Sequence, residues 1–239
     1  IPFFRYSVSI LKGALSVITI ITQYGELLLR AMGQTLLLAL CGLFFACIIG
    51  LVFGMMSVLK SKVCRAIAQI FVDIVRGVPM IVLAFFVFFG VPYFFKNVLG
   101  NNITLSALTA GTICLALNCG AYMAEIIRAG IQSVDKGQME AARSLGLTYW
   151  KSMRKVVLPQ AIRTMIPSII NQFIITLKDT SILSVIGFPE LVNSAKNVVA
   201  ITFKSFETWL IVGIMYLIII TALSKLAKVL ERRLNRGRQ

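Results

Sequence analysis

A long apolar run at residues 33–59 constrains the fold more than any other feature of the chain. The run contains no Asp, Glu, Lys or Arg. About 20 apolar residues in a helix are enough to cross the roughly 30 Å hydrocarbon core of a bilayer. A soluble domain of this size would not sustain several charge-free runs of such length. The run therefore predicts a membrane-spanning helix.

Four further runs have the length and composition of membrane spans. They cover residues 66–89, 105–127, 166–186 and 209–226. The fold class expected from the five runs is all-α integral membrane, with five transmembrane helices. We divide the chain into an N-terminal interfacial or lead-in segment (residues 1–27), a five-helix transmembrane domain (28–230) and a basic tail (231–239).

The charge of the chain is strongly positive, with 24 Lys and Arg against 9 acidic residues and a net charge of +15. In a soluble protein this excess would suggest nucleic-acid binding. In a membrane protein it is typical of cytoplasmic loops. Placing the N-terminus outside puts sixteen basic residues in the inner loops and tail, and far fewer outside. The sequence thus predicts a multi-pass protein of the cytoplasmic membrane with its C-terminus inside, contacting lipid but not nucleic acid.

The chain offers little material for catalysis or metal binding. It has no His, so His-based triads and imidazole ligands are excluded. Its five Cys show no metal-type spacing, and four lie within apolar runs, where Cys packs as a small hydrophobe. It also has no G-x-x-x-x-G-K-[ST] run, the loop that cradles nucleotide phosphates. We expect no catalytic residues, no metal and no cofactor in this chain.

The segment between the third and fourth runs, residues 132–160, is too long for a simple turn and is expected to fold. Asp135 is placed to cap a short helix that Gly146 would end. Thr148 is placed to cap a second helix, which Pro159 would terminate. A helical pair of this kind between two spans suggests a docking element for a partner.

The same segment carries a motif. Residues 140–142 read Glu-Ala-Ala, Gly146 follows, and residues 157–159 read Val-Leu-Pro. At this spacing the run resembles the EAA signature of ABC importer permeases. The resemblance implies a type I importer permease whose loop docks on a separate ATP-binding subunit, which binds ATP and Mg. The residues that it assigns to coupling are Glu140, Ala141, Ala142, Arg143, Leu145, Gly146 and Pro159.

Three further runs resemble polar-amino-acid permeases within this family. Residues 76–79 read Arg-Gly-Val-Pro where the family has Arg-Gly-Thr-Pro, and residues 118–126 resemble its Asn-x-Gly-Ala-Tyr-x-Ala-Glu stretch. Residues 171–172 read Asn-Gln and residues 178–181 read Lys-Asp-Thr-Ser, as in the corresponding segment of these permeases. The resemblance implies an importer subunit for a polar amino acid, working with a second permease copy or paralogue. An extracytoplasmic binding protein or fused domain would deliver the substrate.

Polar residues inside the predicted spans are the candidates for the substrate pathway. A charge at mid-membrane costs roughly 2.5–3.5 kcal/mol on insertion scales, so it usually faces a cavity or a partner. A zwitterion needs a cation for its carboxylate and acceptors for its ammonium group. The candidates are Arg76, Asn118, Tyr122, Glu125, Lys178, Asp179 and Ser181. Alternatively, Asp73–Arg76 and Glu125–Arg128 are i,i+3 pairs that stabilise helix ends.

Other functions remain open at this stage. The substrate could instead be an opine or a sulfur amino acid. An ion-coupled secondary transporter would leave the motif at residues 140–159 unexplained. An intramembrane enzyme would need a nucleophile and a base, for which the sequence offers no convincing pair.

Overall fold

The computed structural model describes the backbone of residues 2–235 and the side chains of residues 15–229. Helices make up almost all of the described chain, and no strand occurs in it. Five helical segments are long and apolar enough to cross a membrane: Leu15–Val58, Met80–Val98, Ala107–Gln132, Tyr149–Ile186 and Ser205–Val229. The predicted fold class is confirmed. The basic tail at residues 231–239 lies beyond the residues whose side chains are described.

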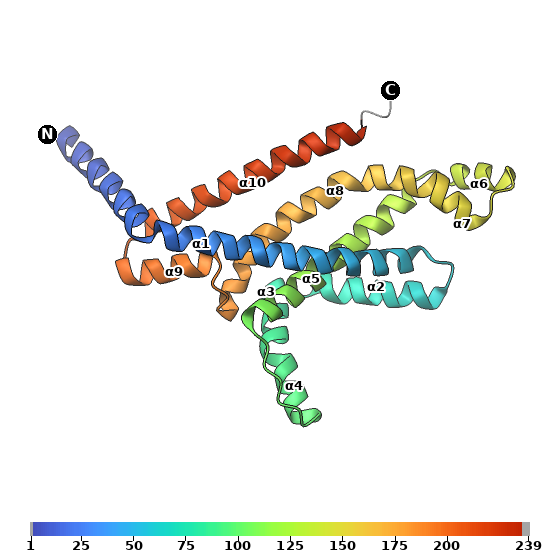
Figure 1. The fold of residues 1–239 in the computed structure, drawn as a ribbon, viewed down its shortest axis with the longest axis horizontal. Coiled ribbons are helices and arrows are strands. Elements are labelled where there is room, and N and C mark those ends of the chain that lie inside the picture. Colours follow the sequence, from blue (N-terminus) through green and yellow to red (C-terminus); the bar gives the residue numbers. More distant parts are fainter. Residues whose placement is uncertain (1, 236–239) are drawn as a thin grey trace.

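Helix α1 (Pro2–Val58) and helix α5 (Ala107–Gln132) form the centre of the bundle, as Figure 1 shows. Glycines of α1 let the two helices approach closely, since Gly42, Gly50 and Gly54 lie against Leu115, Met123 and Ile127. Each of these pairs is separated by 73 residues, so the helices run parallel and in register. Small residues at such contacts are typical of membrane helix pairs.

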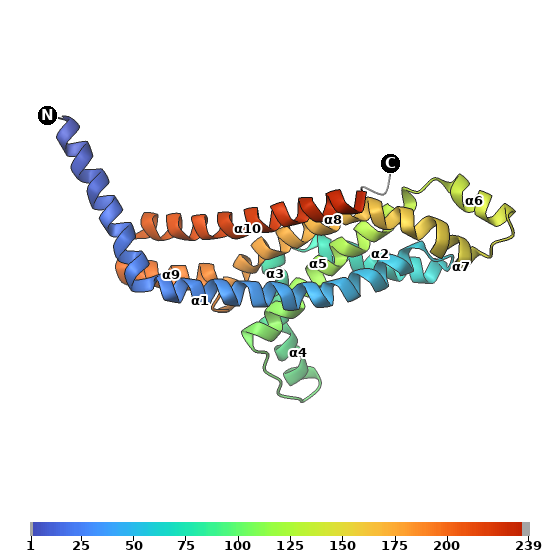
Figure 2. The same ribbon diagram turned by 45° about the horizontal axis from the view of Figure 1, so that its top comes forward.

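Helix α1 passes through the predicted boundary at residues 27 and 28 without a break. Side chains from both sides of the boundary, Ile20 and Leu28, pack in one cluster with α9 (Leu191–Thr202) and α10 (Ser205–Asn235). Figure 2 shows the first turns of α1 inclined away from the bundle. The division of the chain at this point stays a prediction.

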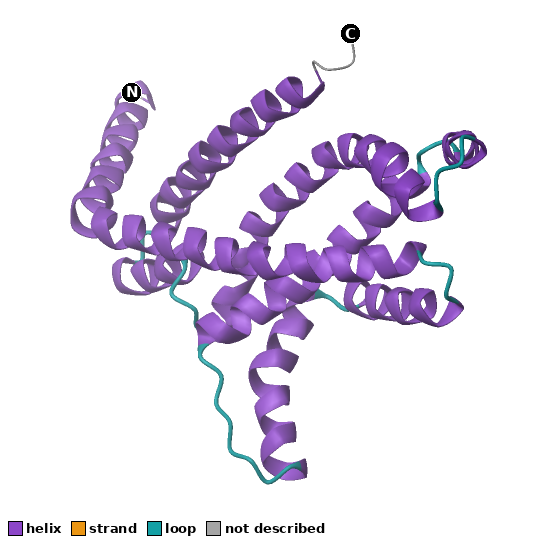
Figure 3. Cartoon of the chain, turned by 45° about the vertical axis from the view of Figure 1, so that its right-hand side comes forward, coloured by secondary structure: helices purple, strands orange, loops and turns teal. Residues whose placement is uncertain are grey.

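The second predicted span, residues 66–89, is wrong as a single helix. Helix α2 (Lys62–Gly77) ends before Val78, whose backbone is extended (φ −100°, ψ 130°), and α3 (Met80–Phe85) begins after Pro79. Proline removes a backbone donor and forces the preceding residue out of the helical region, so the helix breaks here. The chain continues through η1 (Phe86–Gly90) into α4 (Val91–Val98). This arm leaves the bundle steeply (Figure 3), and α4 buries none of its side chains.

The expected stop at Pro159 is also wrong. Helix α7 (Tyr149–Ser152) continues through a π-helical turn, η2 (Met153–Val157), into α8 (Leu158–Asp179). Pro159 lies in the first turn of α8, where its missing N–H is tolerated, and the π turn absorbs the change in hydrogen-bond register. Helix α8 then passes into the 3₁₀ turn η3 (Thr180–Ile186), which ends at the left-handed Gly187.

Candidate functional site

A cavity of about 510 Å³ opens where three of these elements meet. It lies between the break after α2, the middle of α5 and the last turns of α8. The sequence had pointed to four of its lining residues, and six more complete it. The lining residues are Arg76, Gly77, Val78, Pro79, Met80, Asn118, Tyr122, Gln172, Ile175 and Asp179.

The cation of the cavity is Arg76, in the last turn of α2. Its guanidinium carbon lies 5.0 Å from the centre of the Tyr122 ring, a cation–π contact that orients the group. A basic residue is also favourable at a helix C-terminus, where the backbone dipole is negative. Pro79 ends α2 at this point, so the break in the backbone places Arg76 at the edge of the cavity.

Asp179 supplies the anion on the opposite wall. It is the last residue of α8 and is partly buried, and Gln172 lies two turns earlier on the same face. Asn118 is buried on α5, and its Nδ2 lies 3.8 Å from Met80 Sδ. The cavity therefore combines one cation, one carboxylate, two amides and the phenol of Tyr122, and the other side chains of the lining are apolar.

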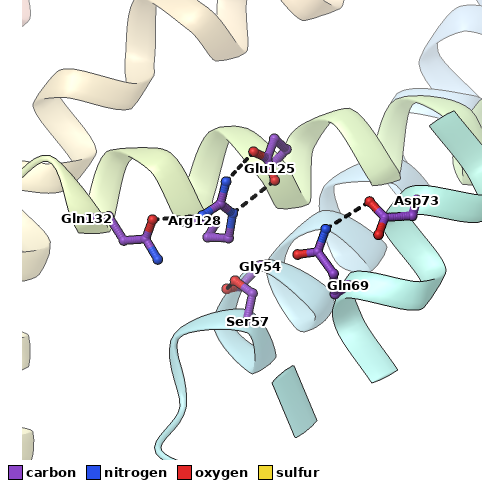
Figure 4. A network of polar contacts seen from close by, with 7 residues as sticks. All are labelled: Gly54, Ser57, Gln69, Asp73, Glu125, Arg128 and Gln132. Atoms are coloured by element: carbon purple, nitrogen blue, oxygen red, sulfur yellow. Dashed lines mark hydrogen bonds and ion pairs between the residues drawn. The ribbon is translucent and has the colours of Figure 1, made fainter. Parts of the chain in front are cut away.

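Three predicted pathway residues lie elsewhere. Lys178 is exposed and absent from the lining, and the hydroxyl of Ser181 donates to the Lys178 carbonyl at 2.7 Å. Glu125 binds Arg128, with Arg128 Nε donating to Oε2 at 3.0 Å. This is the i,i+3 pair that the alternative interpretation expected. Asp73 forms no such pair with Arg76 among the described side chains. Figure 4 shows it accepting a hydrogen bond from Gln69 Nε2 at 2.8 Å.

Gln172 is the polar residue that sequence reasoning missed. The Asn-Gln motif at residues 171–172 contains it, but the motif alone does not say which amide faces the interior. The seven-residue interval between Gln172 and Asp179 gives that signal, because residues seven apart lie on one helix face. The structure buries Gln172 to 6% exposure and leaves Asn171 exposed.

The loop at residues 132–160 is called the coupling loop here after the role that the sequence resemblance implies. It contains one free-standing helix, α6 (Lys136–Ser144). Asp135 Oδ1 accepts the N–H of Gly137 at 2.7 Å, which confirms the expected cap. At the other end Gly146 has φ +83°, and the N–H groups of Gly146 and Leu147 donate to the carbonyls of Arg143 and Ala142. This is a Schellman ending, which favours glycine because of the positive φ.

The outward surface of α6 is open while its inner side is anchored. Glu140, Ala141 and Arg143 are exposed, and Leu145 is 84% exposed, although it is a large apolar side chain. Ala142 is buried. The loop also attaches to the bundle through a core that joins α5 to α8; its buried members are Ile127, Ile131, Met153, Val157, Ala161 and Met165. Movement of the loop would thus act directly on two of the helices that line the cavity.

A second link connects the loop to the turn between α1 and α2. Lys60 Nζ lies 5.2 Å from the centre of the Tyr149 ring, a cation–π contact. Gln160 Nε2 also donates to Gln138 Oε1 at 3.3 Å across the loop. These contacts hold the two ends of the loop to one another and to the adjacent helical turn.

Comparison with known proteins identifies the family. Residues 42–236 match the family model described as the binding-protein-dependent transport system inner membrane component. The chain belongs to this family. Membership, together with the five apolar helices, places this permease in the inner membrane as a multi-pass protein. It also identifies the chain as the membrane-spanning component of a transport system rather than an enzyme.

Relatives of the permease share most of its length. The glutamine transport system permease protein GlnP of Escherichia coli is 36% identical over 208 residues, which cover 87% of this chain and 93% of GlnP. The probable amino-acid ABC transporter permease protein YckA of Bacillus subtilis is 35% identical over 205 residues, covering 86% and 88%. The similarity thus includes the cavity helices and the coupling loop.

Solved structures confirm the architecture. A chain from a crystal structure of an amino acid ABC transporter with histidines superposes with a TM-score of 0.82 at 37% identity, covering 89% of this chain and 96% of that one. A chain of the inward-facing MetNI methionine ABC transporter gives 0.73 at 20% identity, over 88% and 97%. The second likeness shows the fold alone. The permease has the fold of a type I ABC importer subunit.

Proposed function

We propose that this permease is the membrane-spanning subunit of an ATP-driven importer that carries a polar amino acid by alternating access. The observation that carries the proposal is the cavity at the helix breaks, because its polar groups match a zwitterion. Arg76 offers a cation to an α-carboxylate, and Asp179 offers a carboxylate to an α-ammonium group. The names of the relatives, which are amino-acid and glutamine permeases, support the same substrate class.

The amides and the size of the cavity narrow the class further. Asn118 and Gln172 each offer a donor and an acceptor, which suits a side chain that ends in a polar group. A volume of about 510 Å³ is at the lower end of the range for small-molecule sites. One amino acid with part of its hydration shell fits this space, whereas an oligosaccharide does not.

ATP and Mg bind to a separate subunit in this proposal, and the coupling loop is the surface on which that subunit docks. The exposed residues of α6 and its turn form the contact, with Leu145 as the apolar anchor and Glu140 as the charged neighbour. Gly146 turns the chain so that α6 stands clear of the bundle. The exposed Ala141 keeps the outward face of α6 narrow enough to enter a groove, and the buried Ala142 lets the inner face pack closely.

The remaining partners follow from the topology. The N-terminus lies outside and the C-terminus inside, so that the basic residues of the coupling loop face the cytoplasm. An extracytoplasmic binding protein or fused domain delivers the amino acid to the outer face. A second permease, either identical or paralogous, completes the translocation unit about a twofold axis.

The test is purification from the native membrane followed by reconstitution. Mass spectrometry of the purified complex should find an ATP-binding subunit in equal number, and one amino acid should stimulate ATP hydrolysis and uptake. Recovery of the permease alone, with uptake unaltered in liposomes that contain no ATP, would overturn the proposal in favour of an ion-coupled transporter.

A charge reversal tests the docking surface. Glu140→Lys should leave the protein inserted and uncouple ATP hydrolysis from uptake, because α6 would present the wrong charge to the partner. Glu26→Lys is the matched control, since Glu26 is also an exposed helical glutamate but lies on α1, far along the chain from the loop. Normal substrate-stimulated hydrolysis and uptake in the Glu140 variant would refute the docking assignment.

A further inference from the structure

Helix α2 separates its polar and apolar residues on different faces. All of its charged residues and its one glutamine recur at intervals of three or four, which places them on a single face: Lys62, Arg65, Gln69, Asp73 and Arg76. Val63, Ile67, Ile70 and Ile74 form a second, exposed apolar face. A third face packs inward through Ala68, Val72 and Val75. A helix that only contacted lipid and the bundle would have no use for the first of these faces.

Helix α5 carries a matching polar face. Its members follow the same spacing through the half of the helix beyond the cavity: Asn118, Tyr122, Glu125, Arg128 and Gln132. Hydrogen bonds connect three of them, since Arg128 Nε donates to Glu125 Oε2 at 3.0 Å and Arg128 Nη1 donates to Gln132 Oε1 at 2.8 Å. The face thus continues from the cavity to the end of α5 as a chain of linked polar side chains.

The two polar faces meet. Helix α2 packs against α5, and the contact of Arg76 with Tyr122 joins the faces at the cavity. Figure 4 shows the next residues in one neighbourhood, with Gln69 and Asp73 on α2 near Glu125 and Arg128 on α5. Ser57, in the last turn of α1, lies beside them and donates to the Gly54 carbonyl.

The joined faces extend well beyond the cavity along both helices. Fourteen residues separate Arg76 from Lys62, a distance of about 21 Å along a helix. From Tyr122 to Gln132 the distance along α5 is about 15 Å. The α5 part belongs to a helix that is long and apolar enough to cross the membrane, so Glu125 and Arg128 would each cost about 2.5–3.5 kcal/mol if they faced lipid at mid-membrane. Water along the joined faces removes that cost.

The opposite side of the cavity is apolar. Each of the surrounding helices continues past the cavity into one buried cluster: α3 supplies Ala84, α5 supplies Cys114 and Leu115, and η3 supplies Leu183 and Ile186. No charged side chain belongs to this cluster. The cavity is closed by apolar packing at one end and continued by polar side chains at the other.

We propose that the facing polar surfaces of α2 and α5 line a water-filled exit path from the cavity to the end of the bundle that carries the coupling loop. This inference rests on the proposed function and specifies the route by which the solute leaves. Next to the cavity the path has two cations, Arg76 and Arg128, and two carboxylates, Asp73 and Glu125, so this part of its lining is neutral. Lys62 and Arg65 add two cations at the far end of the α2 face. The alternating charges next to the cavity suit a zwitterion and give no net attraction there to a simple anion or cation.

Cysteine labelling tests the path without requiring transport. The background is the complete complex in which Cys41, Cys47 and Cys64 of the permease are replaced by Ser, while the fully buried Cys114 and Cys119 stay. Single variants Gln69→Cys, Asp73→Cys and Gln132→Cys probe the polar faces. Ile70→Cys and Ile74→Cys are matched controls on the same helix, because both are exposed but lie on its apolar face. The probe is a membrane-impermeant, positively charged methanethiosulfonate reagent in native vesicles.

We expect the three polar positions to react at least tenfold faster than the two controls, and only when the reagent is added on the side of the coupling loop. Equal rates on both faces of α2, or no reaction at Gln69→Cys and Asp73→Cys, would overturn the path. Amino-acid uptake is measured on the cysteine-reduced background itself. If uptake is normal but the cysteines at 69 and 73 are not labelled, the path is rejected and the proposed function is retained. If these cysteines are labelled but uptake does not depend on ATP, the path is supported and the proposed function is rejected.

Discussion

Enlarging Gly50 on α1 by a single methyl group should displace α5, the helix that carries Asn118 and Tyr122 of the cavity lining. A Cβ built at Gly50 would lie 2.4 Å from Met123 Cβ and 3.3 Å from the Gly120 carbonyl oxygen of α5. Ordinary contacts are at least 3.4 Å, so the two helices must separate by about 1 Å. Both obstructing atoms are close to the backbone of α5, and a change of rotamer cannot remove them.

The magnitude follows from two opposing terms. Alanine is better than glycine in a helix by roughly 0.5–1 kcal/mol. Overpacking of a well-packed contact costs about 1–3 kcal/mol. Gly50→Ala should therefore lose about 1 kcal/mol of stability. Gly33 lies on the same helix, and a Cβ built there would have nothing within 4 Å. Gly33→Ala should therefore raise the stability by the gain in helix propensity alone. For a chain of this size each kcal/mol corresponds to about 2–4 °C in Tm.

The assay compares thermal unfolding of the two variants in the same detergent, followed by uptake in proteoliposomes. Gly50→Ala should unfold several degrees below Gly33→Ala. It should also transport more slowly, because Asn118 and Tyr122 move with α5. A Tm for Gly50→Ala equal to or above that of Gly33→Ala would refute the reasoning that α1 and α5 pack too closely at Gly50 to admit a Cβ atom.

Three further predictions concern ionisable side chains. Asp179→Asn should weaken substrate binding by about 1.5–3 kcal/mol, roughly 10- to 150-fold, because a charged partner of the ammonium group is lost, whereas Lys178→Gln should leave the dissociation constant near wild type. Isothermal titration of the two variants checks this, and equal losses in both would contradict it. Glu190 is fully buried at the start of α9, where its carboxylate accepts the N–H groups of Val192 and Asn193 at 2.8 and 2.6 Å, so Glu190→Ala should cost about 1–2 kcal/mol in thermal unfolding. Burial raises the pKa of Glu190, so its ionisation opposes folding: stability is greatest below the ordinary pKa of a glutamate and falls as the pH rises through the raised value. The Tm of the wild type should therefore drop with rising pH relative to that of Glu190→Gln, and parallel Tm curves for the two proteins would exclude this effect.

The number and nature of the membrane helices could be predicted from the sequence, because apolar length is a local property that needs no partner. The ends of the helices could not. The run at residues 66–89 is apolar enough for one span, and only the backbone restriction at Val78 and Pro79 divides it. At Pro159 the sequence predicted a helix end, but the π turn before it lets the helix continue. Proline thus breaks the helix at Pro79 and lies in the first turn of α8 at Pro159, and the surrounding structure decides which of the two occurs.

The cavity shows a similar division. A polar side chain within a predicted span could be recognised from the sequence, which pointed to Arg76, Asn118, Tyr122 and Asp179. Their convergence could not, since it depends on the angle at which α2, α5 and α8 meet. Lys178 illustrates this limit: it is adjacent to Asp179 in the chain, yet it is exposed and outside the cavity. Adjacent residues on a helix point about 100° apart, so only the packed structure decides between them.

The positions of the helix breaks explain why the site lies where it does. Arg76 stands at the end of α2 and Asp179 at the end of α8, each at a point where regular hydrogen bonding changes. Interrupted helices leave backbone groups free to contact a solute, which a membrane protein tolerates only around a cavity. Such junctions are also the places where a helix bends with little loss of hydrogen bonding. The coupling loop is joined through a packed core to α5 and to the α8 that ends at Asp179. Movement of the loop would therefore act on α5 and α8, which carry Asn118, Tyr122 and Asp179 of the cavity lining.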